Sequence, residues 1–140
     1  MNCQTKCIWP TFTLLTVLAG CGSVLESYAT SSGVASTTYV NIDKANIRDV
    51  AQSFRQFASR EQLNCSRPIN APRDILDSCD GQGGMYITMI EESRRLKFLA
   101  QTHPMLMMKN EDKAKASLRE LSGRLADDLR SKFGDAVESK

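Results

Sequence analysis

The sequence has few of the residues and motifs from which catalytic sites are built. It contains a single histidine and a single tryptophan, and only 6% of its residues are aromatic. It has neither a glycine-rich phosphate loop nor a Gly-x-Ser-x-Gly nucleophile elbow. Glu91 and Glu92 are adjacent, so on a strand they would point to opposite faces and would not form an acid/base pair. We therefore expect a protein that is not an enzyme and needs no cofactor.

A large excess of charge of one sign is also lacking. The 140 residues include 18 Lys and Arg against 16 Asp and Glu, which gives a formal net charge of +2. Proteins that bind nucleic acid through its phosphates present a clearly basic surface. The composition therefore argues against a nucleic-acid partner.

The uncharged apolar run at residues 8–18 is too short to span a bilayer stably. Its length is that of the hydrophobic region of a secretory signal, about 7 to 15 residues. Lys6 and the amino terminus are the positive charges ahead of it. The run indicates a targeting segment, and the alternative is a cytosolic protein with a buried N-terminal helix.

The run ends in Val17-Leu18-Ala19-Gly20-Cys21, which resembles the lipobox of bacterial lipoprotein precursors. The resemblance implies that residues 1–20 are cleaved as a signal peptide and that Cys21 becomes the lipidated first residue, labelled by palmitate. Gly22 stands where an aspartate would retain a lipoprotein in the inner membrane of many Gram-negative bacteria. We therefore expect a lipid anchor in the cell outer membrane, with the mature protein facing the periplasm.

Cleavage before Cys21 would leave Cys65 and Cys79 as the two cysteines without lipid, because Cys3 and Cys7 lie in the signal. In an oxidising compartment, two remaining cysteines predict one disulfide bond. Such a bond would stabilise the fold by roughly 3 kcal/mol through the entropy of the closed loop. The alternative is that the two cysteines bind a metal or form a redox pair. This is disfavoured because they lie much further apart in the sequence than the cysteines of a Cys-x-x-Cys motif.

The rest of the chain divides into a tether and one domain. Residues 21–38 comprise the lipidated cysteine and a stretch rich in Ser, Thr, Ala and Gly, which predicts a flexible tether. Residues 39–140 are enough for one small core and too few for two domains.

Hydrophobic periodicity predicts the elements of this domain. They are a short strand at 39–42, a helix from 47 to about 62 capped by Asn46, a long loop at 63–84, a hairpin of strands at 85–90 and 96–101, and a helix at 110–133 stopped by Gly134. A single helix through 91–101 is the alternative to the hairpin. The fold class is therefore α+β, a small antiparallel sheet of about three strands with two helices packed on one face.

The helix at 110–133 carries a narrow stripe of apolar residues. Its members are Ala114, Leu118, Leu121, Leu125 and Leu129. Such a stripe usually covers a sheet, and the alternative is a coiled-coil seam with another chain.

If the helices cover the sheet face that carries Leu96 and Phe98, the opposite face presents a different set of side chains. Tyr86, Ile90 and Leu99 would form an apolar patch on that face, a usual mark of a protein-binding site. The alternative is that the loop at 66–84 covers the patch.

One cluster suggests metal binding. His103, Met105, Met107 and Met108 lie within six residues, and imidazole and thioether groups are ligands suited to Cu(I). The alternative is a packed connection, because methionine fills cores and Pro104 is expected to end the strand.

A lipid anchor, a tether and a small domain without catalytic residues suit an accessory or scaffold protein. We therefore expect a non-enzymatic outer-membrane lipoprotein that binds an envelope protein or assembly. Copper handling in the periplasm through the His/Met cluster is the alternative.

Overall fold

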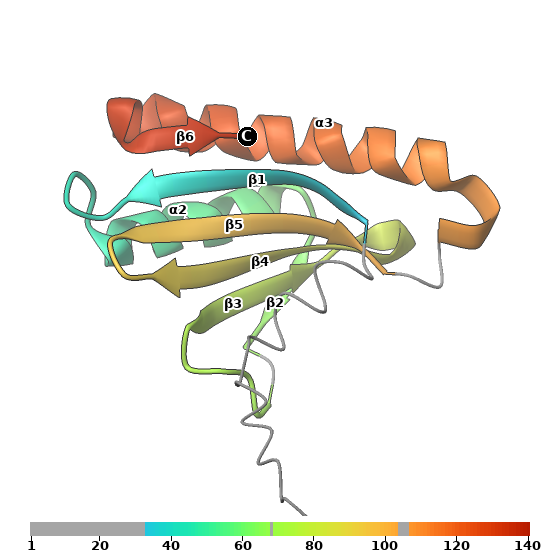
Figure 1. Ribbon diagram of the computed structural model, residues 1–140, viewed down its shortest axis with the longest axis horizontal. Coiled ribbons are helices and arrows are strands. Elements are labelled where there is room, and N and C mark those ends of the chain that lie inside the picture. Colours follow the sequence, from blue (N-terminus) through green and yellow to red (C-terminus); the bar gives the residue numbers. More distant parts are fainter. Residues whose placement is uncertain (1–32, 68, 104–106) are drawn as a thin grey trace, which may run out of the picture.

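The computed structural model describes residues 33–67, 69–103 and 107–140 (Figure 1). Within these ranges the chain is α+β, with one antiparallel sheet and two α-helices. The elements in chain order are β1 (Val34–Asn41), α2 (Ile47–Arg60), β2 (Asn64–Ser66), β3 (Ile75–Asp80), η1 (Gln82–Gly84), β4 (Met85–Glu92), β5 (Arg95–Thr102), α3 (Met107–Phe133), η3 (Gly134–Ala136) and β6 (Val137–Ser139).

The sheet has six strands rather than the predicted three or so. Their order across the sheet is β2-β3-β4-β5-β1-β6, and each neighbouring pair is antiparallel. β2 and β3 both lie in the stretch expected to be loop. β2 gives no signal because its three residues are all exposed, and the inward-facing Asp77 and a register shift interrupt the apolar alternation of β3.

β1 begins at Val34, inside the range expected to be tether. Ser and Thr residues made this stretch look like a linker, yet Thr38 is fully buried in the sheet. The strand predicted at 39–42 is therefore the end of a longer strand, which pairs with β5 on one side, from Val34 to Asn41, and with β6 on the other.

α2 begins where the sequence predicted. The Asn46 side chain accepts a hydrogen bond from the backbone N of Arg48 at 2.8 Å, which caps the helix. The predicted apolar face of this helix is buried, with Val50, Phe54 and Phe57 in the core.

α3 ends at Phe133, and Gly134 follows in the left-handed region with φ 52°. Because a side chain is disfavoured there, glycine suits the end of the helix, as predicted. The leucines of the stripe, from Leu118 to Leu129, are buried against the sheet and α2. The stripe therefore covers the sheet, which was the favoured interpretation over a coiled-coil seam.

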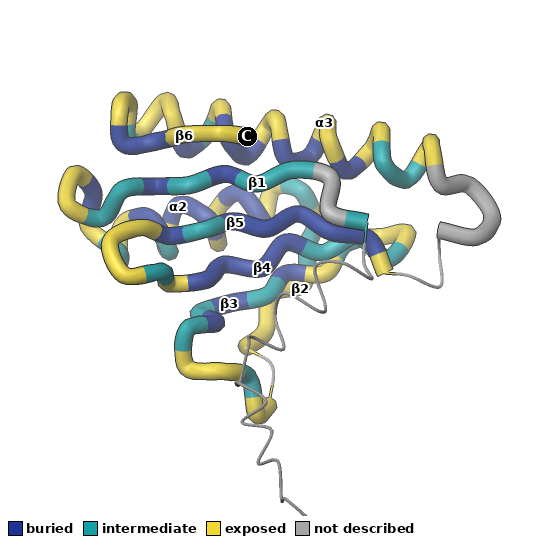
Figure 2. Tube along the Cα trace, in the orientation of Figure 1, coloured by how far each residue is buried: buried dark blue, intermediate teal, exposed yellow. Residues whose placement is uncertain are grey.

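One core joins both helices to one face of the sheet (Figure 2). The sheet residues in this core are Val40, Cys79, Ile87, Met89, Leu96, Phe98 and Ala100. The β4–β5 hairpin is confirmed, with Glu92 paired to Arg95 around a tight turn.

Candidate functional site beside the disulfide

A disulfide bond joins the edge strand β2 to β3. Cys65 and Cys79 lie directly opposite each other in the register of the two strands, and their sulfur atoms are 2.01 Å apart. Cys79 is fully buried in the core, whereas Cys65 is exposed. The predicted disulfide is confirmed, and it fastens a strand of only three residues to the sheet.

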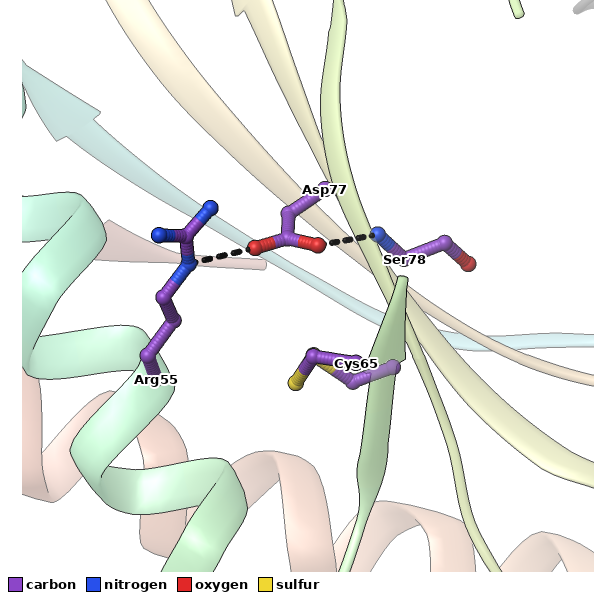
Figure 3. The surroundings of a disulfide bond; sticks show 5 residues. Arg55, Cys65, Asp77 and Ser78 are labelled. Atoms are coloured by element: carbon purple, nitrogen blue, oxygen red, sulfur yellow. Dashed lines mark hydrogen bonds and ion pairs between the residues drawn. A yellow bond between two sulfur atoms is a disulfide. The ribbon is translucent and has the colours of Figure 1, made fainter. Parts of the chain in front are cut away.

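A buried carboxylate lies close to this bond (Figure 3). Asp77, on β3, has a side chain only 3% exposed, and its Oδ2 accepts a hydrogen bond from Arg55 Nε of α2 at 2.8 Å. Its Oδ1 accepts from the backbone N of Ser78 at 3.1 Å. Removing a carboxylate from water is costly unless it is paired and hydrogen-bonded, and both oxygens of Asp77 have such partners.

A surface hollow of about 340 Å³ opens beside the ion pair and the disulfide. It is lined by Arg55, Ser59, Leu63, Cys65, Ser66, Arg67 and Asp77. Two arginines therefore face a hollow whose lining contains one carboxylate. The guanidinium groups of arginine can bind an oxyanion.

This site has little signal in the sequence because its residues come from three separate parts of the chain. Arg55 and Asp77 are 22 residues apart and meet only when α2 packs over the sheet. The available signal was Asp77 itself, a charged residue two positions before Cys79 and buried on the same face of a short strand. A charge at such a position needs a partner.

A second hollow, of about 440 Å³, lies where the β4–β5 turn meets β1 and β6. Its cations already have partners: Arg95 Nε is 2.9 Å from Glu92, and Arg94 is 2.6 Å from Asp43. The Arg95 guanidinium also stacks 4.2 Å above the centre of the Tyr39 ring. The positive charges of Arg94 and Arg95 in this hollow are therefore already neutralised by neighbouring carboxylates.

The acid in this second hollow has an altered pKa. Partial burial acts to raise the pKa of Glu92, but hydrogen bonds and charge from Arg95 and Lys97 outweigh it. The pKa of Glu92 therefore lies below its ordinary value.

The residues predicted to bind a partner lie on the sheet face opposite the helices. Ile90 and Leu99 meet there, but they are only 5% and 8% exposed, because Ile75 and Ala71 pack against them. Tyr86 is half-buried. For Ile90 and Leu99, the structure matches the alternative in which residues of the 66–84 stretch cover this face.

The residues of the predicted copper cluster are only partly described. His103 is exposed, and its backbone N donates a hydrogen bond to Gly84 O at 2.8 Å. Met105 lies outside the described residues, as do the side chains of Met107 and Met108 at the start of α3. Within the described residues, no group of three or more His, Cys, Asp and Glu side chains could hold a metal ion. Copper binding stays a prediction.

Residues 1–32, which contain Cys21 and the lipobox, lie outside the described part of the chain. Among the helices that the structure does describe, none combines the length and the apolar character needed to cross a membrane. Comparisons with protein families, with curated proteins and with solved structures found no match for this chain.

Proposed function

We propose that this chain is an outer-membrane lipoprotein, anchored through Cys21, whose folded domain is not an enzyme and binds another protein of the envelope. The proposal combines the lipobox-like residues Leu18 to Cys21 with the chemistry of the folded domain.

The single structural observation that carries the proposal is the disulfide between Cys65 and Cys79. Disulfides persist in oxidising compartments and are rare in the cytosol of most organisms. The two cysteines that follow the lipobox are the two that pair, as expected for an exported protein. This supports the interpretation of residues 1–20 as an export signal.

The position of β1 limits how far the domain can reach from the membrane. Because β1 begins at Val34, the chain takes 13 residue-to-residue steps from a lipid on Cys21 to the sheet. Fully extended, they span at most about 45 Å. The partner would therefore lie at the membrane surface or close to it.

Palmitate labelling tests the anchor. Cys21→Ser is expected to abolish labelling and to leave an unprocessed precursor, because lipidation requires the sulfur of that residue. Cys7→Ser is the matched control, since it removes a cysteine of the signal and should label as the wild type does. Label that persists in Cys21→Ser would end the lipoprotein proposal.

Cross-linking in intact cells tests the binding role separately. Cells producing the lipidated protein are expected to give an adduct between this domain and a second envelope protein. The Cys21→Ser precursor should give less of that adduct, because it is not held at the same membrane. Adducts of the chain with itself alone would contradict the proposed role.

A further inference from the structure

We propose that the hollow lined by Arg55 and Arg67 binds a carboxylate side chain of an extended acidic peptide on the partner protein. The inference rests on the proposed function, in which this domain binds a protein, and it names the chemistry of the segment that is bound.

The Arg55 guanidinium is held by one nitrogen and leaves its other two accessible. Asp77, buried and fixed on β3, engages only the Nε of the guanidinium, at 2.8 Å. In Figure 3 the dashed line to Asp77 starts at the Nε, and neither terminal guanidinium nitrogen is joined to Asp77. The Arg55 side chain is 66% exposed, so these nitrogens can reach a ligand. A guanidinium held in this way presents two parallel N–H donors, the geometry that matches the two oxygens of a carboxylate.

The charge of the hollow also favours an anion. The lining of this hollow holds two arginines and one carboxylate, and both oxygens of that carboxylate already accept hydrogen bonds. In the other hollow, by contrast, Arg94 and Arg95 are paired with Asp43 and Glu92. The hollow beside the disulfide therefore keeps one positive charge in excess, which favours an anion.

The neighbouring edge strand indicates which kind of anion fits the hollow. β2 forms one edge of the sheet within the described residues, and two of its residues, Cys65 and Ser66, line the hollow. An edge strand presents backbone N–H and C=O groups to which an extended peptide can add. Leu63, also in the lining, offers apolar contact to the methylene groups of a glutamate side chain. An acidic peptide satisfies all three features, whereas a free phosphate would use only the charge.

The test is fluorescence anisotropy with the full-length protein in detergent. The probe is a dye-labelled hexapeptide of alternating Thr and Glu, and the matched peptide carries Gln in place of Glu. The Glu peptide is expected to bind, and the Gln peptide to bind at least about tenfold more weakly, because hydrogen bonds to a charged carboxylate are stronger than those to a neutral amide.

Arg67→Gln is the main variant, because no ion pair of the described residues depends on Arg67. It is expected to weaken the Glu peptide about fivefold to tenfold. Arg55→Gln should weaken it at least as much, although it also leaves Asp77 unpaired, so its fold is checked by circular dichroism. Arg48→Gln is the matched control: it removes the same charge from an exposed position of α2 outside the hollow and should change affinity less than about twofold.

Three results would overturn the inference: no preference for the Glu peptide, equal losses in Arg67→Gln and Arg48→Gln, or displacement of the peptide by an equal concentration of inorganic phosphate. The last would assign the site to a free oxyanion. None of these results bears on palmitate labelling or on cross-linking in cells, so failure of the site and failure of the proposed function can be told apart.

Discussion

The rings of Phe54 in α2 and Phe98 in β5 pack with their centroids 5.1 Å apart and their planes inclined by 59°. This is the tilted arrangement that aromatic pairs favour. Both side chains are almost fully buried. The pair joins the middle of the helix that carries Arg55 to a central strand of the sheet, so it helps to hold that arginine over Asp77.

Phe98→Ala is expected to lower the free energy of unfolding by about 3–5 kcal/mol, because it leaves a cavity beside Phe54 and removes a large buried surface. Urea denaturation followed by circular dichroism measures the change. Phe133→Ala is a suitable comparison, since Phe133 is only partly buried at the end of α3 and should cost less. A loss below about 1 kcal/mol for Phe98→Ala would mean that the helix does not pack on β5 as described.

The disulfide gives a prediction for peptide mapping. After alkylation without reductant, trypsin should release residues 61–73 and 74–94 as one linked species, because the bond after Arg67 precedes proline and resists cleavage. Replacing both Cys65 and Cys79 with alanine should lower the free energy of unfolding by about 2–4 kcal/mol. Two alkylated thiols in the mature wild-type protein would contradict the pairing and weaken the case for an oxidising compartment.

The sequence predicted the helices well, because their apolar residues repeat at the period of a helix, and it predicted the disulfide from the number of cysteines. The buried faces of α2 and α3, the Asn46 cap and the Gly134 stop all lie where predicted, because each depends on residues close together in the chain. The disulfide followed from eliminating the other cysteines.

The sheet was underestimated because its edges have little local signal. β2 and β6 have three residues each, and their stability comes from pairing with strands distant in sequence and, for β2, from the disulfide. The hollow beside the disulfide was missed for the same reason. Arg55 and Asp77 belong to separate elements, and only the packed fold brings them together.

A buried hydroxyl in β1 offers a stabilising substitution. Thr38 is fully buried, and its Oγ1 has no hydrogen-bond partner among the described residues. Thr38→Val keeps the shape of the side chain, suits a strand and removes the unpaired hydroxyl, so we expect a gain of about 1 kcal/mol in the free energy of unfolding. Thr37→Val, at the half-buried neighbouring position, should change stability by less than about 0.5 kcal/mol. Equal gains in both variants would show that strand propensity, and not the buried hydroxyl, is responsible.

The ion pairs of Glu92 should make the stability of the fold depend on pH. Its pKa in the folded protein is lowered from the ordinary 4.5, so its ion pairs with Arg95 and Lys97 stabilise the fold above that value. This contribution is lost as the pH falls below 4.5 through the lowered pKa, because protonation removes the charge. Glu92→Gln should therefore be less stable than the wild type at pH 7, by about 0.5 kcal/mol for a partly exposed pair, and the two should converge at low pH. Denaturation at a series of pH values checks this, and a constant difference at every pH would contradict it.

Leu99 decides whether the sheet face opposite the helices is core or docking surface. Because Leu99 is 8% exposed and packs with Ile75 and Ile90, Leu99→Asp would place a carboxylate in an apolar cluster. We expect it to lower the free energy of unfolding by at least about 2 kcal/mol. Leu99→Met is the matched control, since it conserves volume and should cost less than about 1.5 kcal/mol.

Both variants are measured by urea denaturation and by cross-linking in cells. If Leu99→Asp unfolds like the wild type but loses the partner adduct, the face with Ile90 and Leu99 is a docking surface. A large loss of stability assigns that face to the core and leaves the hollow beside the disulfide as the proposed binding surface.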